Sequence, residues 1–301
     1  MRFQYVVSSA IERERPSTVL IQEDGTKFGQ IVAREARSQE VACLAVFGNI
    51  PAYDPFGNIF GRVPHVASAC AVTGPLLKTN RNGFGAFDEN SVVTGNRFSP
   101  VDNHGMQREE IYAKLHIEKT KRLFVFSSQP FPESDKIHNV LIAMMKHFPE
   151  KHLVISLHPL ESYWRSRGAA RRAELRNVTI TKRFKTIDLI AIADLVGTIS
   201  SSTALDARIL DKPVFILGLN QYIVDQPYFE PTVSPYVECG AAFGVYRYAD
   251  LVPAIRSILQ DTSAQERMAR CRGQFVKMHS ACNGKSVENN MSFEAALRGN
   301  V

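Results

Sequence analysis

The sequence predicts an α/β protein with two domains, each built around a parallel sheet. From residue 122 onward, apolar strand-like segments of about five residues alternate with helical segments, and residues 1–100 repeat this pattern more loosely. Strands separated by helices are joined by crossover connections and pair in parallel. The strand segments are apolar almost throughout, which is typical of a sheet covered on both faces. A chain of 301 residues is long enough for two such domains.

The first domain combines short strands with long polar segments. We expect a helix and four strands there: a helix at 28–38 and strands at 18–22, 41–47, 65–74 and 91–96. The segment 48–64 is rich in Gly, Pro and Asn and predicts a long loop. Segment 99–112 carries Pro, Asp, Asn, His and Gly and predicts a linker. The expected division is therefore an N-terminal Rossmann-like domain at 1–110 and a C-terminal one at 111–301.

The second domain alternates more regularly. We expect strands at 122–128, 153–159, 178–181, 195–199 and 213–218. We expect the intervening helices at 137–148, 161–176, 186–193 and 202–210. Two further helices, at about 248–260 and 263–281, are expected to close the chain.

Composition excludes several classes of protein. The formal net charge of +6 suits a protein that handles phosphates, but no dense Lys/Arg tract marks a nucleic-acid module. The arginine clusters at 13–15 and 165–172 are interpreted as solvated helix faces. Five cysteines without a CxxC pair argue for a reducing compartment and against a zinc site. No apolar stretch is long enough to span a membrane, and the N-terminal one is too short for a secretory signal. We expect a cytoplasmic protein, compatible with peripheral attachment to the inner face of the membrane.

Polar motifs follow four of the expected strands, at the sheet edge where ligands bind in open α/β sheets. The first is Q-E-D-G at 22–25. One carboxylate of Glu23 and Asp24 can face a cleft and take a proton from an acceptor hydroxyl, with Gly25 closing the turn. An ordinary Asp-Gly turn is the alternative interpretation.

The second and third motifs follow the first two strands of the second domain. Ser127 and Ser128 offer hydroxyl and backbone N–H groups suited to phosphate oxygens. His158 ends a strand, and Pro159 biases its backbone to an extended conformation. An imidazole there can exchange a proton or bind phosphate. A structural turn is the alternative for both motifs.

The fourth motif is a run of hydroxyl side chains between a strand and a helix: Ser200, Ser201, Ser202 and Thr203. Hydroxyls and unpaired N–H groups at a helix start favour an anion site. A plain serine cap would account for only one of these four residues. Together the four motifs predict an interdomain cleft that holds a nucleotide mono- or diphosphate.

The order of these motifs resembles a known family of enzymes. The stretch N-S-V-V-T-G-N-R-F at 90–98, which contains Asn96, and the tail at 270–286 resemble the GT-B glycosyltransferases of bacterial surface polysaccharide synthesis. Acid-acid-Gly, then His-Pro, then Ser/Thr is similar to the bacterial sialyltransferases and polysialyltransferases. Only about 20 residues precede the acid-acid-Gly turn, whereas that family has more strands there. The resemblance therefore implies a GT-B fold with an abbreviated first domain, whose exposed sheet edge a homodimer would cover.

The resemblance also implies a mechanism. Glu23 or Asp24 would be the base, with Glu23 favoured, and His158 would assist departure of the nucleotide while the Ser/Thr run holds its phosphate. The transfer would be inverting, from a CMP- or UDP-linked sugar such as sialic acid to a glycan or lipid-linked acceptor. No Asp-x-Asp pair is present, and neither a metal nor a cofactor is required. Tyr222 would border the nucleotide or the acceptor.

Three other functions stay open at this point. CDP-alditol phosphotransferases also carry His-Pro and a Ser-rich helix start. The 2-epimerases of UDP-N-acetylglucosamine (UDP-GlcNAc) end in a similar strand and helix, but usually with Asp-Ser-Gly-Gly, which this sequence lacks. A non-catalytic sugar-nucleotide binder is the third alternative.

Overall fold

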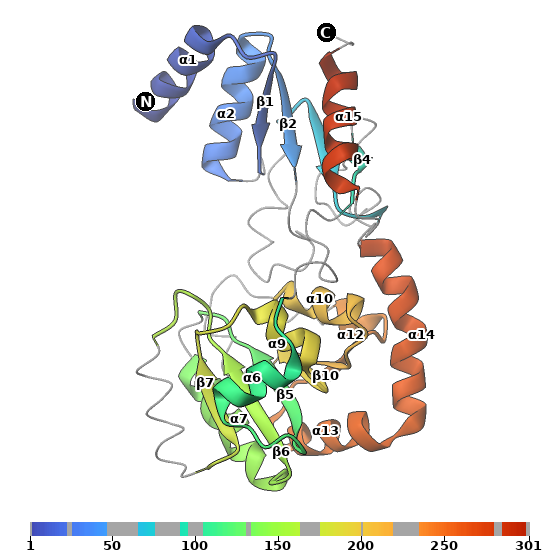
Figure 1. Ribbon diagram of the computed structural model, residues 1–301. Coiled ribbons are helices and arrows are strands. Elements are labelled where there is room, and N and C mark those ends of the chain that lie inside the picture. Colours follow the sequence, from blue (N-terminus) through green and yellow to red (C-terminus); the bar gives the residue numbers. More distant parts are fainter. Residues whose placement is uncertain are drawn as a thin grey trace. The chain divides into compact units, whose positions relative to one another are not determined.

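The computed structural model places the chain in two compact units (Figure 1). It describes residues 2–22, 26–46, 66–75, 91–95, 105–130, 134–162, 175–199, 201–218, 235–279 and 285–298. Unit 1 comprises residues 1–99 and 276–301, and unit 2 comprises residues 100–275. The C-terminal segment thus belongs to the first unit, whereas the expected division at residue 110 assigned it to the second domain.

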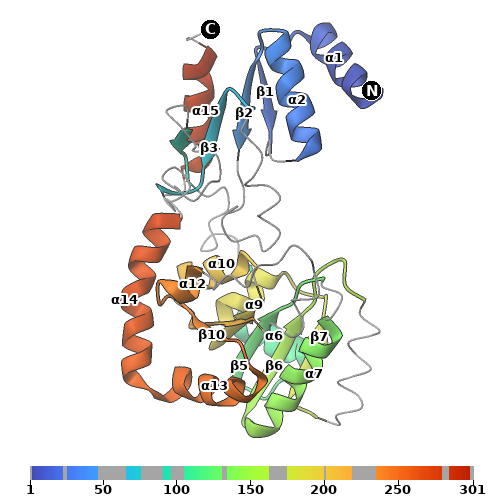
Figure 2. The same ribbon diagram turned by 180° about the vertical axis from the view of Figure 1, so that it is seen from behind.

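Unit 1 contains a parallel sheet whose described strands lie in chain order, β1-β2-β3-β4. The strands are β1 (Thr18–Ile21), β2 (Ala42–Val46), β3 (Ala69–Val72) and β4 (Ser91–Val93). The helices are α1 (Arg2–Glu14), α2 (Lys27–Ser38) and α15 (Ser286–Arg298). In Figures 1 and 2, α2 lies beside β1 and α15 lies beside β3 and β4. The expected strands of this domain are confirmed, with shorter bounds.

Alternation of side chains along β2 gives the sheet of unit 1 two covered faces. Cys43 packs with Ile11 of α1 and Ala33 and Ala36 of α2. Leu44, the next residue, points to the other face and packs in a cluster joined by Phe293 of α15. Asn289 of α15 also donates a hydrogen bond from Nδ2 to the Thr94 carbonyl oxygen at 3.1 Å.

Unit 2 contains a six-stranded parallel sheet in the order β10-β9-β8-β5-β6-β7. The strands are β5 (Arg122–Ser127), β6 (Lys151–Ser156), β7 (Val178–Thr181), β8 (Leu195–Thr198), β9 (Val214–Leu217) and β10 (Phe243–Val245). The α-helices are α6 (Arg108–Leu115), α7 (Ser134–Met144), α9 (Thr186–Ile192), α10 (Thr203–Ile209), α12 (Pro235–Glu238), α13 (Leu251–Gln260) and α14 (Thr262–His279). Two 3-10 turns are η2 (Met145–His147) and η3 (Tyr248–Asp250). The five expected strands are confirmed, but β6 ends at Ser156, so His158 and Pro159 follow the strand and do not belong to it.

The strand order of unit 2 reverses once. The chain runs outward from β5 to β6 and β7, then returns to place β8 on the other side of β5, and continues outward to β9 and β10. The switch point of this sheet is therefore the boundary between β5 and β8. In open α/β sheets, ligands bind outside the carboxyl ends of the strands at such a point.

The core of unit 2 follows from the same alternation. Phe124 and Phe126 of β5 belong to a cluster that takes its helical side chains from α7, η2, α13 and α14. The intervening Leu123 and Val125 point to the opposite face and are also buried. Both faces of the sheet are covered, which explains why the strand segments are apolar throughout.

The structure adds elements that the sequence patterns did not predict. Helix α6 occupies 108–115 and so begins within the linker expected at 99–112, because Ile111 and Tyr112 are buried against the unit. The bounds of helix α1, of which only the arginine cluster at 13–15 was interpreted as a helix face, were not expected, nor were α12, α15 and the short strand β10. The predicted helix at 161–176 and the predicted loop at 48–64 lie largely outside the described residues. None of the described helices is long and apolar enough to cross a membrane.

Candidate functional site

Hydrogen bonds connect the carboxyl ends of β5, β8 and β6 at the switch point of unit 2. Ser127 is the last residue of β5, and its carbonyl oxygen accepts a hydrogen bond from Thr198 Oγ1 of β8 at 3.0 Å. Ser128 N donates to the carbonyl oxygen of Ser156, the last residue of β6, at 2.9 Å. The ends of β8, β5 and β6 therefore lie side by side at one edge of the sheet.

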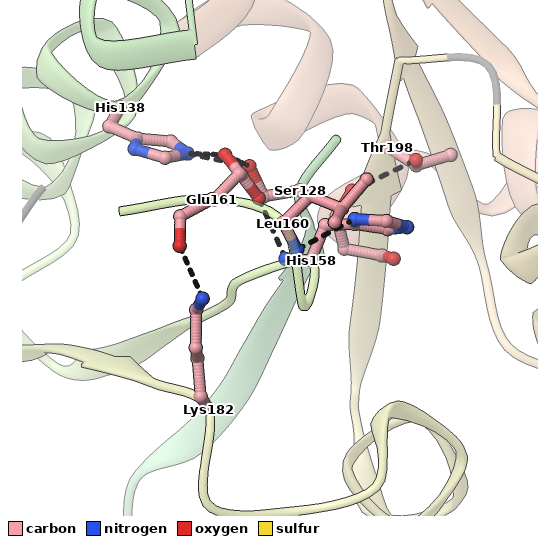
Figure 3. Close-up of polar contacts among 8 residues, drawn as sticks. Ser128, His138, His158, Leu160, Glu161, Lys182 and Thr198 are labelled. Atoms are coloured by element: carbon pink, nitrogen blue, oxygen red, sulfur yellow. Dashed lines mark hydrogen bonds and ion pairs between the residues drawn. The ribbon is translucent and has the colours of Figure 1, made fainter. Parts of the chain in front are cut away.

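The predicted His158 lies in a closed turn just beyond β6 (Figure 3). The backbone N–H of Glu161 donates to the His158 carbonyl oxygen at 3.0 Å, and Leu157 N donates to the Thr181 carbonyl oxygen of β7 at 3.0 Å. Lys182, which follows β7, donates from Nζ to the carbonyl oxygens of Pro159, at 2.9 Å, and of Glu161. Three sets of hydrogen bonds therefore fix the turn: one from Leu157 to β7, one between Glu161 and His158, and those from Lys182.

One hydrogen bond assigns the tautomer of His158. The backbone N–H of Leu160 donates to His158 Nδ1 at 3.2 Å, so Nδ1 carries no hydrogen in this arrangement. Of the two neutral tautomers, this bond fits the one with its hydrogen on Nε2. The ring is half-buried and presents Nε2–H as a donor. Protonation of Nδ1 would set two N–H groups against each other and break the bond from Leu160.

A buried glutamate joins the predicted serine and histidine motifs. Glu161 Oε2 accepts the backbone N–H of His158 at 2.7 Å, and Oε1 accepts the hydroxyl of Ser128 at 2.7 Å. His138 Nε2 lies 2.7 Å from the same hydroxyl oxygen. Because the Ser128 hydroxyl hydrogen is given to Glu161, we assign the hydrogen between His138 and Ser128 to His138 Nε2.

Burial governs the electrostatics of this network. It lowers the pKa of His138 from 6.5 to about 4, so the ring is neutral at physiological pH. Burial also raises the pKa of Glu161, an effect opposed by its hydrogen bonds and by the charge of Lys182. A carboxylate that accepts several short hydrogen bonds is compensated even where little water reaches it.

The hydroxyl run lies beyond β8, next to the switch point. Ser201 Oγ accepts the backbone N–H of Thr203 at 3.3 Å, and Ser201 and Ser202 carbonyl oxygens accept the first N–H groups of α10. Ser202 is exposed. Thr203 Oγ1 is buried and has no hydrogen-bond partner among the described residues. A half-buried carboxyl group one turn further along, Asp206, has its pKa raised to about 6 by burial.

The structure brings some of the predicted site residues together. Ser127, Ser128, His158 and Pro159 follow adjacent strands, and Ser201, Ser202 and Thr203 follow the strand on the other side of β5. Six predicted residues lie outside the described part of the chain: Glu23, Asp24, Gly25, Asn96, Ser200 and Tyr222. The placement of Ser128 differs from a phosphate ligand, because its side chain is buried and its hydroxyl bonds to Glu161 and His138.

Three residues of the network were not singled out from the sequence. Glu161 carried a signal, since an acid three residues after His158 can accept the N–H groups of a turn. His138 is one of several polar residues in a helical segment, and Lys182 follows a strand. Nothing in their local sequence shows that they meet the His-Pro turn.

The two described cavities in unit 2 lie at the opposite end of the strands. A cavity of about 590 Å³ is bordered by Arg122 and Lys151, the first residues of β5 and β6. A second, of about 380 Å³, is bordered by Arg122 and by Pro213, just before β9. Neither includes a residue of the His158 turn or of the hydroxyl run, so we place the candidate site by topology and hydrogen bonding instead.

Solved structures with the same architecture are glycosyltransferases and sugar-nucleotide epimerases. The UDP complex of MnaA from S. aureus superimposes with a TM-score of 0.68 at 15% identity, covering 98% of this chain and 79% of that one. A glycosyltransferase from Rickettsia africae superimposes with a TM-score of 0.62 at 14% identity, covering 98% and 81%. Anabaena HepE, solved with UDP and glucose, gives 0.62 at 14% identity, covering 98% and 80%.

These likenesses define the fold. The chain has two α/β units with parallel sheets and the architecture of GT-B proteins, so the expected fold class is confirmed. No protein-family model matches the sequence, and no curated protein matches it.

Proposed function

We propose that the protein is a glycosyltransferase that binds the nucleotide of a sugar donor at the carboxyl edge of the sheet in unit 2. The observation that carries this proposal is the position of the switch point, where the ends of β5 and β8 are flanked by the His158 turn and the hydroxyl run. Neighbours of the same fold solved with UDP, or with UDP and glucose, support a nucleotide-sugar ligand.

His158 acts in this proposal as a neutral hydrogen-bond donor. Its Nε2–H meets negative charge that develops on the leaving phosphate, and Leu160 keeps the hydrogen on that nitrogen. A donor that is already oriented costs little reorganisation during the reaction. The exposed hydroxyl of Ser202 is the second group offered to the phosphate.

The remaining parts of the mechanism come from the sequence. Glu23 or Asp24 takes the proton of the acceptor hydroxyl, and the transfer inverts the sugar carbon without a metal or a cofactor. The donor is CMP- or UDP-linked, with an acidic sugar such as sialic acid, and the acceptor is a glycan or lipid-linked chain of a surface polysaccharide. Attachment to the membrane face and dimerisation of the first domain belong to the same proposal.

A second candidate function is 2-epimerisation of UDP-GlcNAc. The observation in its favour is that a Listeria protein described as a putative UDP-GlcNAc 2-epimerase superimposes with a TM-score of 0.68, and a UDP-GlcNAc 2-epimerase from Neisseria meningitidis with 0.62. An epimerase needs no acceptor, so the two functions separate by product. An epimerase converts the sugar nucleotide alone, whereas a transferase releases free nucleotide only with an acceptor present.

A donor panel tests the proposal. CMP-, UDP-, GDP- and CDP-linked donors are screened by thermal shift, and we expect one nucleotide class to raise the Tm. Stabilisation by none of them would exclude the donor site, and selective stabilisation by CDP-glycerol or CDP-ribitol would favour an alditol phosphotransferase. Donors that bind are then assayed for turnover with and without glycan acceptors.

Two sets of variants test the roles. Glu23→Gln and Asp24→Asn should retain donor binding, and the variant of the true base should lose turnover. His158→Gln places an amide N–H near the position of Nε2, so a donor role predicts that it keeps more activity than His158→Ala. Equal loss in both histidine variants would instead favour proton transfer by the ring.

A further inference from the structure

We propose that Glu161 is a positioning residue that sets the orientation and tautomer of His158 by linking the turns after β5 and β6. The inference rests on the proposed function of His158 as a donor to the leaving phosphate. It assigns to Ser128 a place in this linkage rather than a contact with the phosphate.

The Glu161 carboxylate accepts hydrogen bonds from the turns after β5 and β6, and Ser134 of α7 also hydrogen-bonds to it. Oε2 accepts the His158 backbone N–H at 2.7 Å, and Oε1 accepts the Ser128 hydroxyl at 2.7 Å. These segments leave neighbouring strands at the switch-point edge. The Glu161 side chain is 3% exposed, so little water is available to replace either donor.

The hydrogen bonds behind Glu161 run toward its carboxylate. Ser128 donates to Glu161, and with the hydrogen assigned to Nε2 of His138, which is 0% exposed, His138 donates to Ser128. The carboxylate at the end of this chain accepts from both sides and offers no hydrogen of its own. An amide in its place would turn an N–H group toward one of the two donors, so a glutamine cannot reproduce the arrangement.

The backbone of the turn carries this constraint to the ring of His158. Glu161 N donates to the His158 carbonyl oxygen at 3.0 Å, while the side chain of the same residue holds the His158 N–H. Leu160, between them, donates to Nδ1 at 3.2 Å. Without the carboxylate, His158 loses the acceptor of its N–H, the turn relaxes, and the bond that selects the Nε2–H tautomer lengthens.

Imidazole nitrogen spectra of the full chain test the proposal directly. Two-bond proton–nitrogen correlations distinguish the tautomers of a neutral histidine, and His158→Gln identifies the signals of residue 158. We expect the Nε2–H tautomer in the wild type and a mixture of tautomers in Glu161→Gln. Glu150→Gln is the matched control, because Glu150 is 60% exposed and pairs with Lys151 at the opposite end of β6.

Kinetics with the identified donor supply the second arm. We expect Glu161→Gln to lower kcat on the order of tenfold or more, with little change in donor KM, because His158 is displaced and not removed. Ser128→Ala, which keeps the Glu161–His158 bond, should lower kcat less. Glu150→Gln should leave kcat unchanged.

Each outcome decides the question. A wild-type Nδ1–H tautomer, or an unchanged His158 spectrum in Glu161→Gln, would overturn the proposal. A lower Tm with unchanged kcat, measured well below the Tm, would reduce Glu161 to a stabilising residue. If no donor is turned over at all, the proposed function fails, while the spectra still decide whether Glu161 positions His158. The wild-type tautomer is read with His158→Gln alone as the assignment variant, so a Glu161 variant that does not fold still leaves the proposal open to refutation.

Discussion

Replacing Gly197 with alanine should strain the centre of the sheet in unit 2. Gly197 lies in β8, paired with Phe126 of β5 on one side and with Phe215 of β9 on the other. A Cβ atom added at Gly197 would lie 2.1 Å from Phe215 Cζ and 2.4 Å from Cε1. The missing side chain leaves the space that the Phe215 ring fills, where it reaches a centroid distance of 6.3 Å from the Phe126 ring.

The magnitude follows from how little the ring can move. Favourable carbon–carbon contacts lie at about 3.5–4.0 Å, so the Phe215 ring would have to shift by more than about 1 Å. Phe215 is 2% exposed and belongs to the large core cluster, so the shift would displace further side chains. Overpacking of this kind costs about 1–3 kcal/mol. The backbone entropy that alanine saves, about 0.5–1 kcal/mol, offsets only part of that cost.

Urea unfolding of three proteins measures the effect. Gly197→Ala should lower the free energy of unfolding by roughly 1.2 kcal/mol, the middle of the overpacking range, about 2 kcal/mol, less the middle of the entropy range, about 0.75 kcal/mol. Gly273→Ala in α14 is the control, since an added Cβ there meets nothing within 4 Å, and it should stabilise by up to about 1 kcal/mol. In a Phe215→Leu background, Gly197→Ala should cost less. A Gly197→Ala protein as stable as the wild type would refute the reasoning.

Three further predictions concern buried polar groups. Burial lowers the pKa values of His138 and His152 to about 4, below the ordinary 6.5, so the unfolded chain takes up these protons first. Each histidine should therefore lower the stability by roughly 1.4 kcal/mol per pH unit from pH 6.5 toward 4, and His152→Gln should reduce the slope of the urea-derived free energy by that amount, whereas an unchanged slope would contradict this. Burial raises the pKa of Asp206 from 3.8 to about 6, so the stability that this carboxyl group contributes is complete below pH 3.8 and is lost as pH rises through 6. Asp206→Asn should therefore raise the free energy of unfolding by up to about 3 kcal/mol at pH 8 and leave it unchanged near pH 3.5. Equal effects of the substitution at both pH values would contradict this. Asn177 Nδ2 donates to the Met145 and Phe148 carbonyl oxygens at 3.3 and 3.1 Å. Asn177→Ala should therefore lower the free energy of unfolding by about 1–3 kcal/mol, which thermal unfolding would show as a lower Tm. An unchanged Tm would show that water replaces the amide.

The pattern of apolar residues along the sequence was sufficient to predict most of the strands. Segments such as 122–128 and 195–199 are short, apolar and rich in β-branched or aromatic residues, and both form strands of the buried sheet. Helix α6 was missed because its apolar residues number too few to give a helical period within a polar segment. Strand β10 was missed because three residues show no alternation.

Of the candidate site, only the residues that follow strands could be predicted from the sequence. His158, Ser128 and the hydroxyl run follow strands, and parallel pairing brings the ends of such strands to one edge. The link between them was not predictable, because Glu161 and His138 are 23 residues apart in the numbering and meet only through the packing of α7 against the sheet. Their interaction depends on burial and on hydrogen-bond direction, which neither residue type specifies.

The strand and helix periods, the parallel class of the sheets and the residues that end each strand all follow from the order of side chains along the chain. Those features depend on local backbone preference and on which residues avoid water. Strand order, the return of α15 to the first unit, and the use of the Ser128 hydroxyl by Glu161 depend on contacts between distant segments. Such contacts form only when the whole sheet assembles, and they decide that Glu161 meets the turn carrying His158.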